Sequence, residues 1–155
     1  ERLSAEGSNA QLLVVGARHE ENMIKYKNHP NIHIMGERRN VGDYLACADF
    51  FILSSVYEGL PLTLLEAMSM GVVPVCTPAG GIKDVIRDGE NGFLAKDFDT
   101  ESLYDAVTRA IKAGAVISKD AVVREFHEKY SMERCADNYK EIYQPEGSHT
   151  STLNA

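Results

Sequence analysis

Residues 49–77 read DFFILSSVYEGLPLTLLEAMSMGVVPVCT, and this stretch decides the fold class. It contains an apolar run, a loop with Gly59, a segment bounded by Pro61 and Gly71, and a second apolar run. Pro61 suits the first position of a helix, where its missing N–H costs nothing, and Gly71 suits the left-handed residue that ends one. The stretch therefore predicts a strand, a helix and a second strand of one parallel sheet.

The same alternation of apolar runs and helical segments continues on both sides of this stretch. Helices are predicted to begin after Asn40, after Asp99 or Thr100, after Ser118 and after Ser131. The sequence predicts an α/β domain over residues 1–143 and a disordered tail over 144–155. The predicted strands are apolar on both faces, as in buried parallel sheets, and lie at 11–15, 31–35, 49–54, 72–77 and 92–95. The last helix carries an apolar side formed by Met132, Cys135, Ala136, Tyr139, Ile142 and Tyr143.

Composition limits the class of protein. The chain has 155 residues, 44% hydrophobic and 25% charged, which suits one soluble domain with one core. Its net charge of -7 gives no electrostatic reason to bind nucleic acid or an anionic membrane, so a phosphorylated ligand must be held locally. Cys47, Cys76 and Cys135 are an odd number with no close spacing, which argues against a disulfide framework and a structural zinc site, and we expect a reducing, cytoplasmic compartment. No apolar run is long enough to span a membrane, and we expect no signal peptide.

The loop at 54–60 is the candidate ligand site, because ligands of open parallel sheets bind beyond the carboxyl ends of the strands. Gly59 permits close approach of the backbone, and the N–H groups of Leu62 and Thr63 at a helix start suit a diphosphate. Glu58 and Glu66 flank this cradle, and carboxylates accept hydrogen bonds from hydroxyl groups. The predicted ligand therefore carries both phosphate and polyol, as a nucleotide sugar does. The alternatives are that Glu58 complements the helix dipole and that Glu66 is a solvated helix residue.

Four segments closely resemble the C-terminal half of retaining glycosyltransferases of family 4. They are YEGLPLTLLEAM at 57–68, GVVPV at 71–75, GGIKDVI at 80–86 and DGENGFL at 88–94. The resemblance, which extends from about residue 12 to residue 143, implies the GT-B architecture of two Rossmann-like domains facing across a cleft. This chain would be the nucleotide-sugar half, a doubly wound parallel sheet flanked by helices. The parent enzyme would transfer a sugar from a nucleoside diphosphate to an unknown acceptor with retention, in polysaccharide or glycoconjugate biosynthesis.

The resemblance also implies roles for individual residues. Glu58 would be catalytic, facing the transferred sugar and the positive charge at its anomeric carbon, and Glu66 would bind the ribose. Gly59 and the N–H groups of Leu60, Leu62 and Thr63 would hold the diphosphate, so that no metal or other cofactor is expected. On the nucleoside side, the resemblance points to Gly16, Gly36, Glu37 and Arg38, although Arg38 also suits an ordinary surface position.

The start of the chain departs from the family pattern. The strand, Gly-Arg turn and Lys that open this half in the family have no match before Gln11, and the N-terminal acceptor domain is absent. We therefore expect a fragment that is inactive in isolation, and membrane contact through the missing domain stays open. If strand order follows the usual doubly wound pattern, the missing strand is a central one that lies between the strands at 11–15 and 49–54. These two strands should pair directly, or another chain should fill the gap.

Other function classes have weaker support. The alternative to an enzyme is a nucleotide-binding or interaction module without activity of its own. Asp97-Phe98-Asp99 matches the Asp-x-Asp pattern of metal-dependent glycosyltransferases, but Asp99 also suits a helix cap. No Gly-x-Gly-x-x-Gly follows the first strand, which disfavours a nicotinamide-binding domain.

Overall fold

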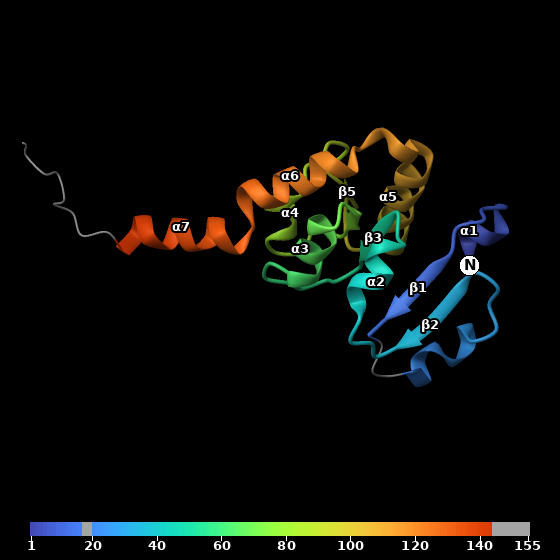
Figure 1. Ribbon diagram of the computed structural model, residues 1–155. Coiled ribbons are helices and arrows are strands. Elements are labelled where there is room, and N and C mark those ends of the chain that lie inside the picture. Colours follow the sequence, from blue (N-terminus) through green and yellow to red (C-terminus); the bar gives the residue numbers. More distant parts are fainter. Residues whose placement is uncertain (17–19, 144–155) are drawn as a thin grey trace, which may run out of the picture. The chain divides into compact units, whose positions relative to one another are not determined.

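The computed structural model describes residues 1–16 and 20–143, and Figure 1 shows the order of their helices and strands. The chain divides into two compact units, residues 1–48 (unit 1) and residues from Asp49 onward (unit 2). The predicted tail at 144–155 lies outside the described residues. Within the described part, no helix has the length and apolar character needed to cross a membrane.

Unit 1 contains a two-stranded parallel sheet. Leu12 lies opposite Ile32, and the register shifts after Val14 so that Val15 lies opposite Gly36. Two short helices of this unit, the first and the 3-10 helix, are absent from the sequence-based prediction. The elements are α1 (Arg2–Ala5), β1 (Leu12–Val15), η1 (Glu20–Tyr26), β2 (Ile32–Gly36) and α2 (Val41–Ala46).

Unit 2 contains a three-stranded parallel sheet in the order β3, β4, β5. Phe50 lies opposite Val73, and Val75 lies opposite Phe93. The strands are β3 (Phe50–Leu53), β4 (Val73–Cys76) and β5 (Phe93–Leu94). The helices are α3 (Leu62–Ser69), α4 (Ile82–Val85), α5 (Thr100–Ala113), η2 (Gly114–Val116), α6 (Lys119–Lys129) and α7 (Met132–Tyr143).

The helix ends of unit 2 follow the local sequence signals closely. Asp99 Oδ1 accepts a hydrogen bond from the N–H of Ser102 at 2.7 Å, and Ser118 caps α6 through the N–H of Ala121. Gly71, with a φ of +71°, follows the end of α3 as predicted. The position of Pro61 is a correction. It is the N-cap, with an extended ψ of 124°, because the regular helix begins one residue later than predicted, at Leu62.

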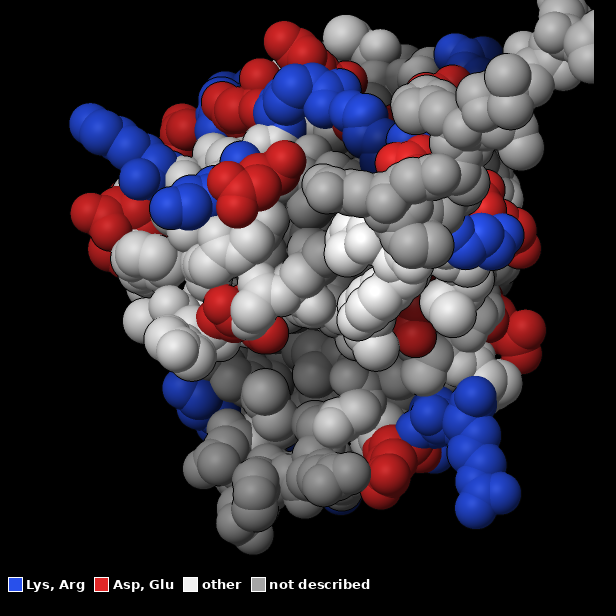
Figure 2. Space-filling view, turned by 90° about the vertical axis from the view of Figure 1, so that its left-hand side faces the viewer, with Lys and Arg blue, Asp and Glu red and all other residues white. Residues whose placement is uncertain are grey.

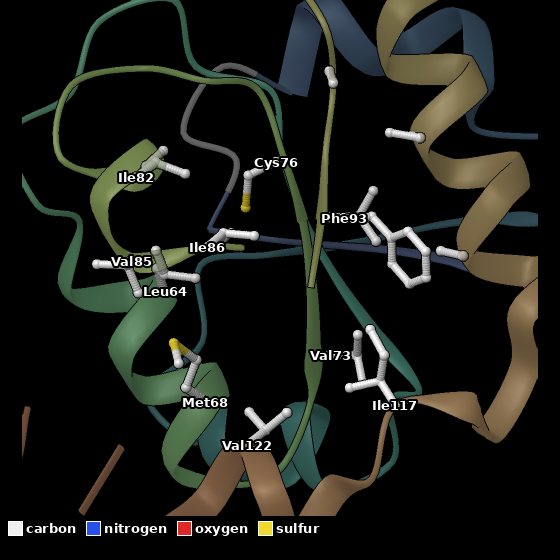
Figure 3. Close-up of a cluster of buried hydrophobic side chains, with 14 of the residues drawn as sticks. Leu64, Met68, Val73, Cys76, Ile82, Val85, Ile86, Phe93, Ile117 and Val122 are labelled. Carbon is white, nitrogen blue, oxygen red and sulfur yellow. The ribbon is translucent and has the colours of Figure 1, made fainter. Parts of the chain in front are cut away.

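The hydrophobic core lies in unit 2, and β4 is buried along its whole length. In Figure 3, side chains of α3 and α4, such as Leu64 and Ile82, lie on one side of the strands, whereas Phe93 and Ile117 lie on the other. This two-sided covering confirms the predicted parallel sheet flanked by helices. Cys76 is fully buried within it, and burial raises the pKa of its thiol to about 12.

The two strands predicted to pair, at 11–15 and 49–54, belong to different units. Within unit 1, β1 pairs with β2, and within unit 2, β3 pairs with β4. Direct pairing of the two strands, or a strand supplied by another chain, stays a prediction.

Candidate functional site

The loop between β3 and α3 holds Glu58 in a defined orientation. The Ser55 hydroxyl donates a hydrogen bond to Glu58 Oε1 at 2.7 Å, and both side chains are partly buried. The other carboxylate oxygen, Oε2, has no partner in the described part of the chain. One oxygen of Glu58 is therefore anchored, and the other is available to a ligand. The sequence singled out Glu58 but not Ser55, because a serine three residues from a glutamate is an unremarkable pattern.

The first turn of α3 offers unpaired N–H groups beside this loop in the chain. Leu64 donates to the carbonyl of Pro61 at 3.1 Å, and Pro61 itself has no N–H. The N–H groups of Leu60, Leu62 and Thr63 have no acceptor among the described residues. Leu60 and Leu62 are 44% and 72% exposed, so this helix end is open to solvent. Free N–H groups and the helix dipole together favour an anion at such a position.

Charged side chains of one sign do not cluster on the face shown in Figure 2. There, Lys and Arg are interspersed with Asp and Glu, and neither sign dominates. The net charge of -7 gives no general attraction for anions. A phosphate group on this chain therefore depends on local donors such as backbone N–H groups.

Glu66 and Gly59 occupy the positions that the sequence indicated. Glu66 lies in the second turn of α3 and is exposed to solvent. Gly59 is exposed, and a Cβ atom built on it meets nothing within 4 Å. The space above Gly59 is therefore free for a ligand, and the ligand-binding roles of Glu66 and Gly59 stay predictions.

The residues predicted to face the nucleoside lie in unit 1. Gly16 donates its N–H to the carbonyl of Gly36 at 2.8 Å, which brings the ends of β1 and β2 together. Arg38 is exposed, and it donates to the hydroxyl of Tyr44 at 3.3 Å and to the carbonyl of Glu37 at 3.2 Å. These contacts are local, and the role of these residues toward a nucleoside stays a prediction.

In the Asp-x-Asp segment at 97–99, both carboxylates accept hydrogen bonds from backbone N–H groups. Asp97 Oδ1 accepts from the N–H of Phe98 at 2.8 Å, and Asp99 caps α5. Across the residues that the structure describes, no three His, Cys, Asp or Glu side chains are grouped so that they could hold a metal ion.

The sequence did not predict a polar network that is centred on the buried carboxylate of Glu125. Glu125 of α6 accepts two hydrogen bonds from Arg87, at 2.6 and 2.9 Å, one from Asn91 at 3.0 Å, and one from Lys129 at 2.8 Å. Hydrogen bonding from Arg87 is the main reason that the pKa of Glu125 falls to about 2. Asn91 also donates to the carbonyl of Val85 at 2.9 Å. The network attaches the DGENG segment to α6, and no spacing rule joins residues so far apart in the sequence.

Comparison with known proteins identifies the family. The family described as glycosyl transferases group 1 matches residues 1–113. The chain belongs to this family. Two relatives are the N-acetyl-alpha-D-glucosaminyl L-malate synthase of Bacillus anthracis and the Vi polysaccharide biosynthesis protein VipC/TviE of Salmonella typhi. The first is 32% identical over 121 residues, covering 73% of this glycosyltransferase chain and 32% of the relative. The second is 42% identical over 81 residues, covering 52% of the chain and 14% of the relative.

Solved glycosyltransferase structures share the fold. Anabaena Alr3699/HepE in complex with UDP matches with a TM-score of 0.74 and 18% identity, over 86% of this chain and 40% of that one. A glycosyltransferase from Rickettsia africae matches with a TM-score of 0.77 and 20% identity, over 90% and 41%. These matches support the predicted Rossmann-like domain of GT-B type in this group 1 glycosyltransferase chain. The chain spans less than half of the length of each of the four proteins named here.

Proposed function

We propose that this chain is the donor-binding half of a retaining GT-B glycosyltransferase of family 4 that uses a nucleoside diphosphate sugar. The observation that carries the proposal is the segment from Ser55 to Thr63. It combines an oriented carboxylate with a helix start whose N–H groups are free and exposed. These two features suit the two halves of a nucleotide sugar, since hydroxyl groups donate to carboxylates and phosphates accept from N–H groups.

In the proposed reaction, the bond between the anomeric carbon and the diphosphate oxygen breaks while an acceptor oxygen bonds to that carbon. The N–H groups of Leu60, Leu62 and Thr63 stabilise the negative charge that develops on the departing diphosphate. Glu58 lies against the sugar and stabilises the positive charge at the anomeric carbon. The acceptor approaches the same face that the diphosphate leaves, and its proton passes to a diphosphate oxygen. The configuration is thereby retained, and the backbone donors serve without a metal ion.

Several observations support a sugar nucleotide as the ligand. One of the structural relatives, Anabaena Alr3699/HepE, has been solved with UDP-glucose, and one of the sequence relatives takes part in Vi polysaccharide biosynthesis. We extend to this chain a donor of the same chemical class and a place in glycoconjugate or polysaccharide biosynthesis, in the cytoplasm. The acceptor would be held by a second domain, so the chain by itself should bind donor without transferring sugar.

Calorimetric titration of the chain with UDP, GDP and ADP tests donor binding. One nucleoside diphosphate should bind, and Glu66→Ala should weaken its binding by about tenfold, because the ribose hydroxyls lose a charged acceptor. Glu128→Ala is the matched control, since Glu128 is also an exposed helix glutamate in α6. Equal weakening in both variants would contradict the ribose role of Glu66. If none of the three nucleotides binds, the titration is repeated with the upstream strand, its Gly-Arg turn and its Lys restored, and failure to bind there would contradict the proposed function.

Steady-state kinetics of the complete enzyme, with the acceptor domain present, tests the role of Glu58. Glu58→Gln should lower kcat by about a hundredfold or more and raise the KM for the donor by only about tenfold, because the charge contributes more to the transition state than to donor binding. Glu66→Ala should mainly raise that KM. If both variants instead weakened donor binding and left turnover unchanged, the assignment of roles would be wrong.

A further inference from the structure

The loop that follows β4, residues 77–81, lies directly against the backbone of Glu58. A Cβ atom on Gly80 would lie 1.9 Å from the carbonyl oxygen of Glu58 and 2.9 Å from that of Gly59. Gly80 also has a φ of +50°, a conformation that residues with side chains rarely adopt. The N–H of the next residue, Gly81, donates to the carbonyl of Gly59 at 2.8 Å. Only a glycine at position 80 permits this close contact between the two loops.

Thr77, at the start of the same loop, contacts the segment that precedes Glu58. Thr77 is 1% exposed, and its hydroxyl donates to the carbonyl of Ser55. The N–H of Thr77 donates to the carbonyl of Leu53 at 3.0 Å. Ser55 in turn donates to the Glu58 carboxylate. The loop at 77–81 therefore contacts the segment 53–59 on both sides of Glu58.

The loop at 77–81 is itself anchored in the core of unit 2. Ala79 is 1% exposed and Ile82 is fully buried. Figure 3 shows Ile82 among the core side chains on the same side of the strands as Cys76. A backbone segment whose neighbours are locked in a packed core has little freedom to move, because interiors are close-packed. It is a rigid support for the more exposed Glu58 loop.

We infer that the loop at 77–81 positions the Glu58 carboxylate for the sugar, with Gly80 and Thr77 as positioning residues. This inference rests on the proposed function of Glu58, which contacts the sugar, whereas Gly80 and Thr77 act through it. A displacement of about 1 Å at a reacting group lowers catalysis by about a hundredfold, so a support of this kind matters to the reaction. Of the diphosphate donors, Leu62 and Thr63 need no such support, because they lie in α3 and the helix itself orients them, whereas Leu60 lies in the loop before it.

Titration of the chain with UDP and UDP-glucose separates the sugar contact from the diphosphate contact. Gly80→Ala should lower the preference for UDP-glucose over UDP by about tenfold, as should Glu58→Gln, because each removes one charge-assisted hydrogen bond to the sugar. In the double variant the two effects should not add. Gly114→Ala is the matched control, since Gly114 has a φ of +56° and nothing lies within 4 Å of its added Cβ. An unchanged preference in Gly80→Ala would overturn the inference.

Thr77→Val and Thr77→Ser test the inference without a steric clash. Valine keeps the shape and removes the hydroxyl, so it should lower the UDP-glucose preference, whereas serine should restore it. A merely structural role would weaken UDP and UDP-glucose equally and leave the preference unchanged, and that result would overturn the inference.

Amide hydrogen exchange tests the support without any ligand. Exchange at residues 56–60 should rise by about tenfold in Gly80→Ala and stay unchanged in Gly114→Ala. Unchanged exchange in Gly80→Ala would overturn the inference even if nucleotides bind. If the wild-type chain binds neither UDP nor UDP-glucose, the proposed function fails for these probes, and the exchange result alone decides whether the 77–81 loop holds the Glu58 segment.

Discussion

The two units of this chain differ sharply in how they bury their strands. In unit 2, β4 lies between two neighbouring strands, and all four of its residues are buried. In unit 1, β1 has one neighbour, its first two residues are exposed, and Gly36 is the one buried residue among those described there. A central strand covered by helices on both faces excludes water, but a two-stranded sheet leaves a free edge on each strand.

This difference shows that similar apolar runs in a sequence can form strands that are buried to very different extents. The runs at 11–15 and 72–77 both predict buried parallel strands, but their observed exposure differs. Only the second lies between two strands and against α3 and α5. Most of the hydrophobic stabilisation therefore comes from unit 2, because the free energy of burial scales with the apolar area removed from water.

The largest expected difference is in the stability lost by two leucine truncations, one in each unit. Leu64→Ala should lower the free energy of unfolding by about 3–5 kcal/mol, because Leu64 is fully buried and the variant leaves a cavity. Leu13→Ala should cost less than about 1 kcal/mol, because Leu13 is 41% exposed. Urea unfolding followed by circular dichroism measures both. Equal losses would show that unit 1 has a core of its own.

The next effect concerns the network around Glu125. Glu125→Gln should lower the free energy of unfolding by about 2–3 kcal/mol, because the variant removes the charge that Arg87 and Lys129 bind. The expected loss is below that for a fully buried pair, since the Arg87 side chain is 48% exposed. Asp137→Asn is the control. Asp137 pairs with Lys140 at the surface of α7, and its loss should cost less than about 0.5 kcal/mol. Similar costs for both variants in urea unfolding would contradict a special role for the network.

The same network predicts a pH dependence of stability. Hydrogen bonding lowers the pKa of Glu125 from its ordinary value of 4.5 to about 2 in the folded state. As pH falls, the unfolded state therefore takes up this proton first. The contribution of Glu125 is complete above about pH 5 and is lost progressively as pH falls toward 2. Wild type should lose about 2 kcal/mol more than Glu125→Gln between pH 5 and pH 2.5 in urea titrations, and parallel curves would refute this.

The smallest expected difference is in the stability lost when two helix caps are removed. Asp99→Ala should cost about 1 kcal/mol, because the Asp99 carboxylate accepts from the N–H of Ser102. Asn40→Ala should cost about 0.3 kcal/mol or less, since Asn40 stands at the N-cap of α2 without a side-chain bond to the helix backbone. Thermal unfolding of both variants gives the comparison, and a larger loss for Asn40→Ala would reverse it.

Much of the fold was predictable from short-range signals. Gly71, Asp99, Gly114 and Ser118 end or begin helices as expected, because each acts on backbone groups within a few residues. The short helices α1 and α4 and the two 3-10 helices were missed, because a single turn shows no clear periodicity. The apolar side predicted for α7 exists as a pattern, but no residue of α7 is buried. Periodicity shows which side is apolar and not what covers it.

The candidate site, like the fold, has some features that the sequence predicted and others that only the tertiary structure shows. The sequence by itself determined the family resemblance, the order of strands and helices, and the position of Glu58 before a helix start, because these depend on residues close together in the chain. Only the tertiary structure decided that Glu125 binds Arg87 and Asn91 and that Gly80 touches the Glu58 backbone. These contacts join residues that are 22 or more positions apart, and no local pattern encodes such a distance, because packing of the whole core selects them.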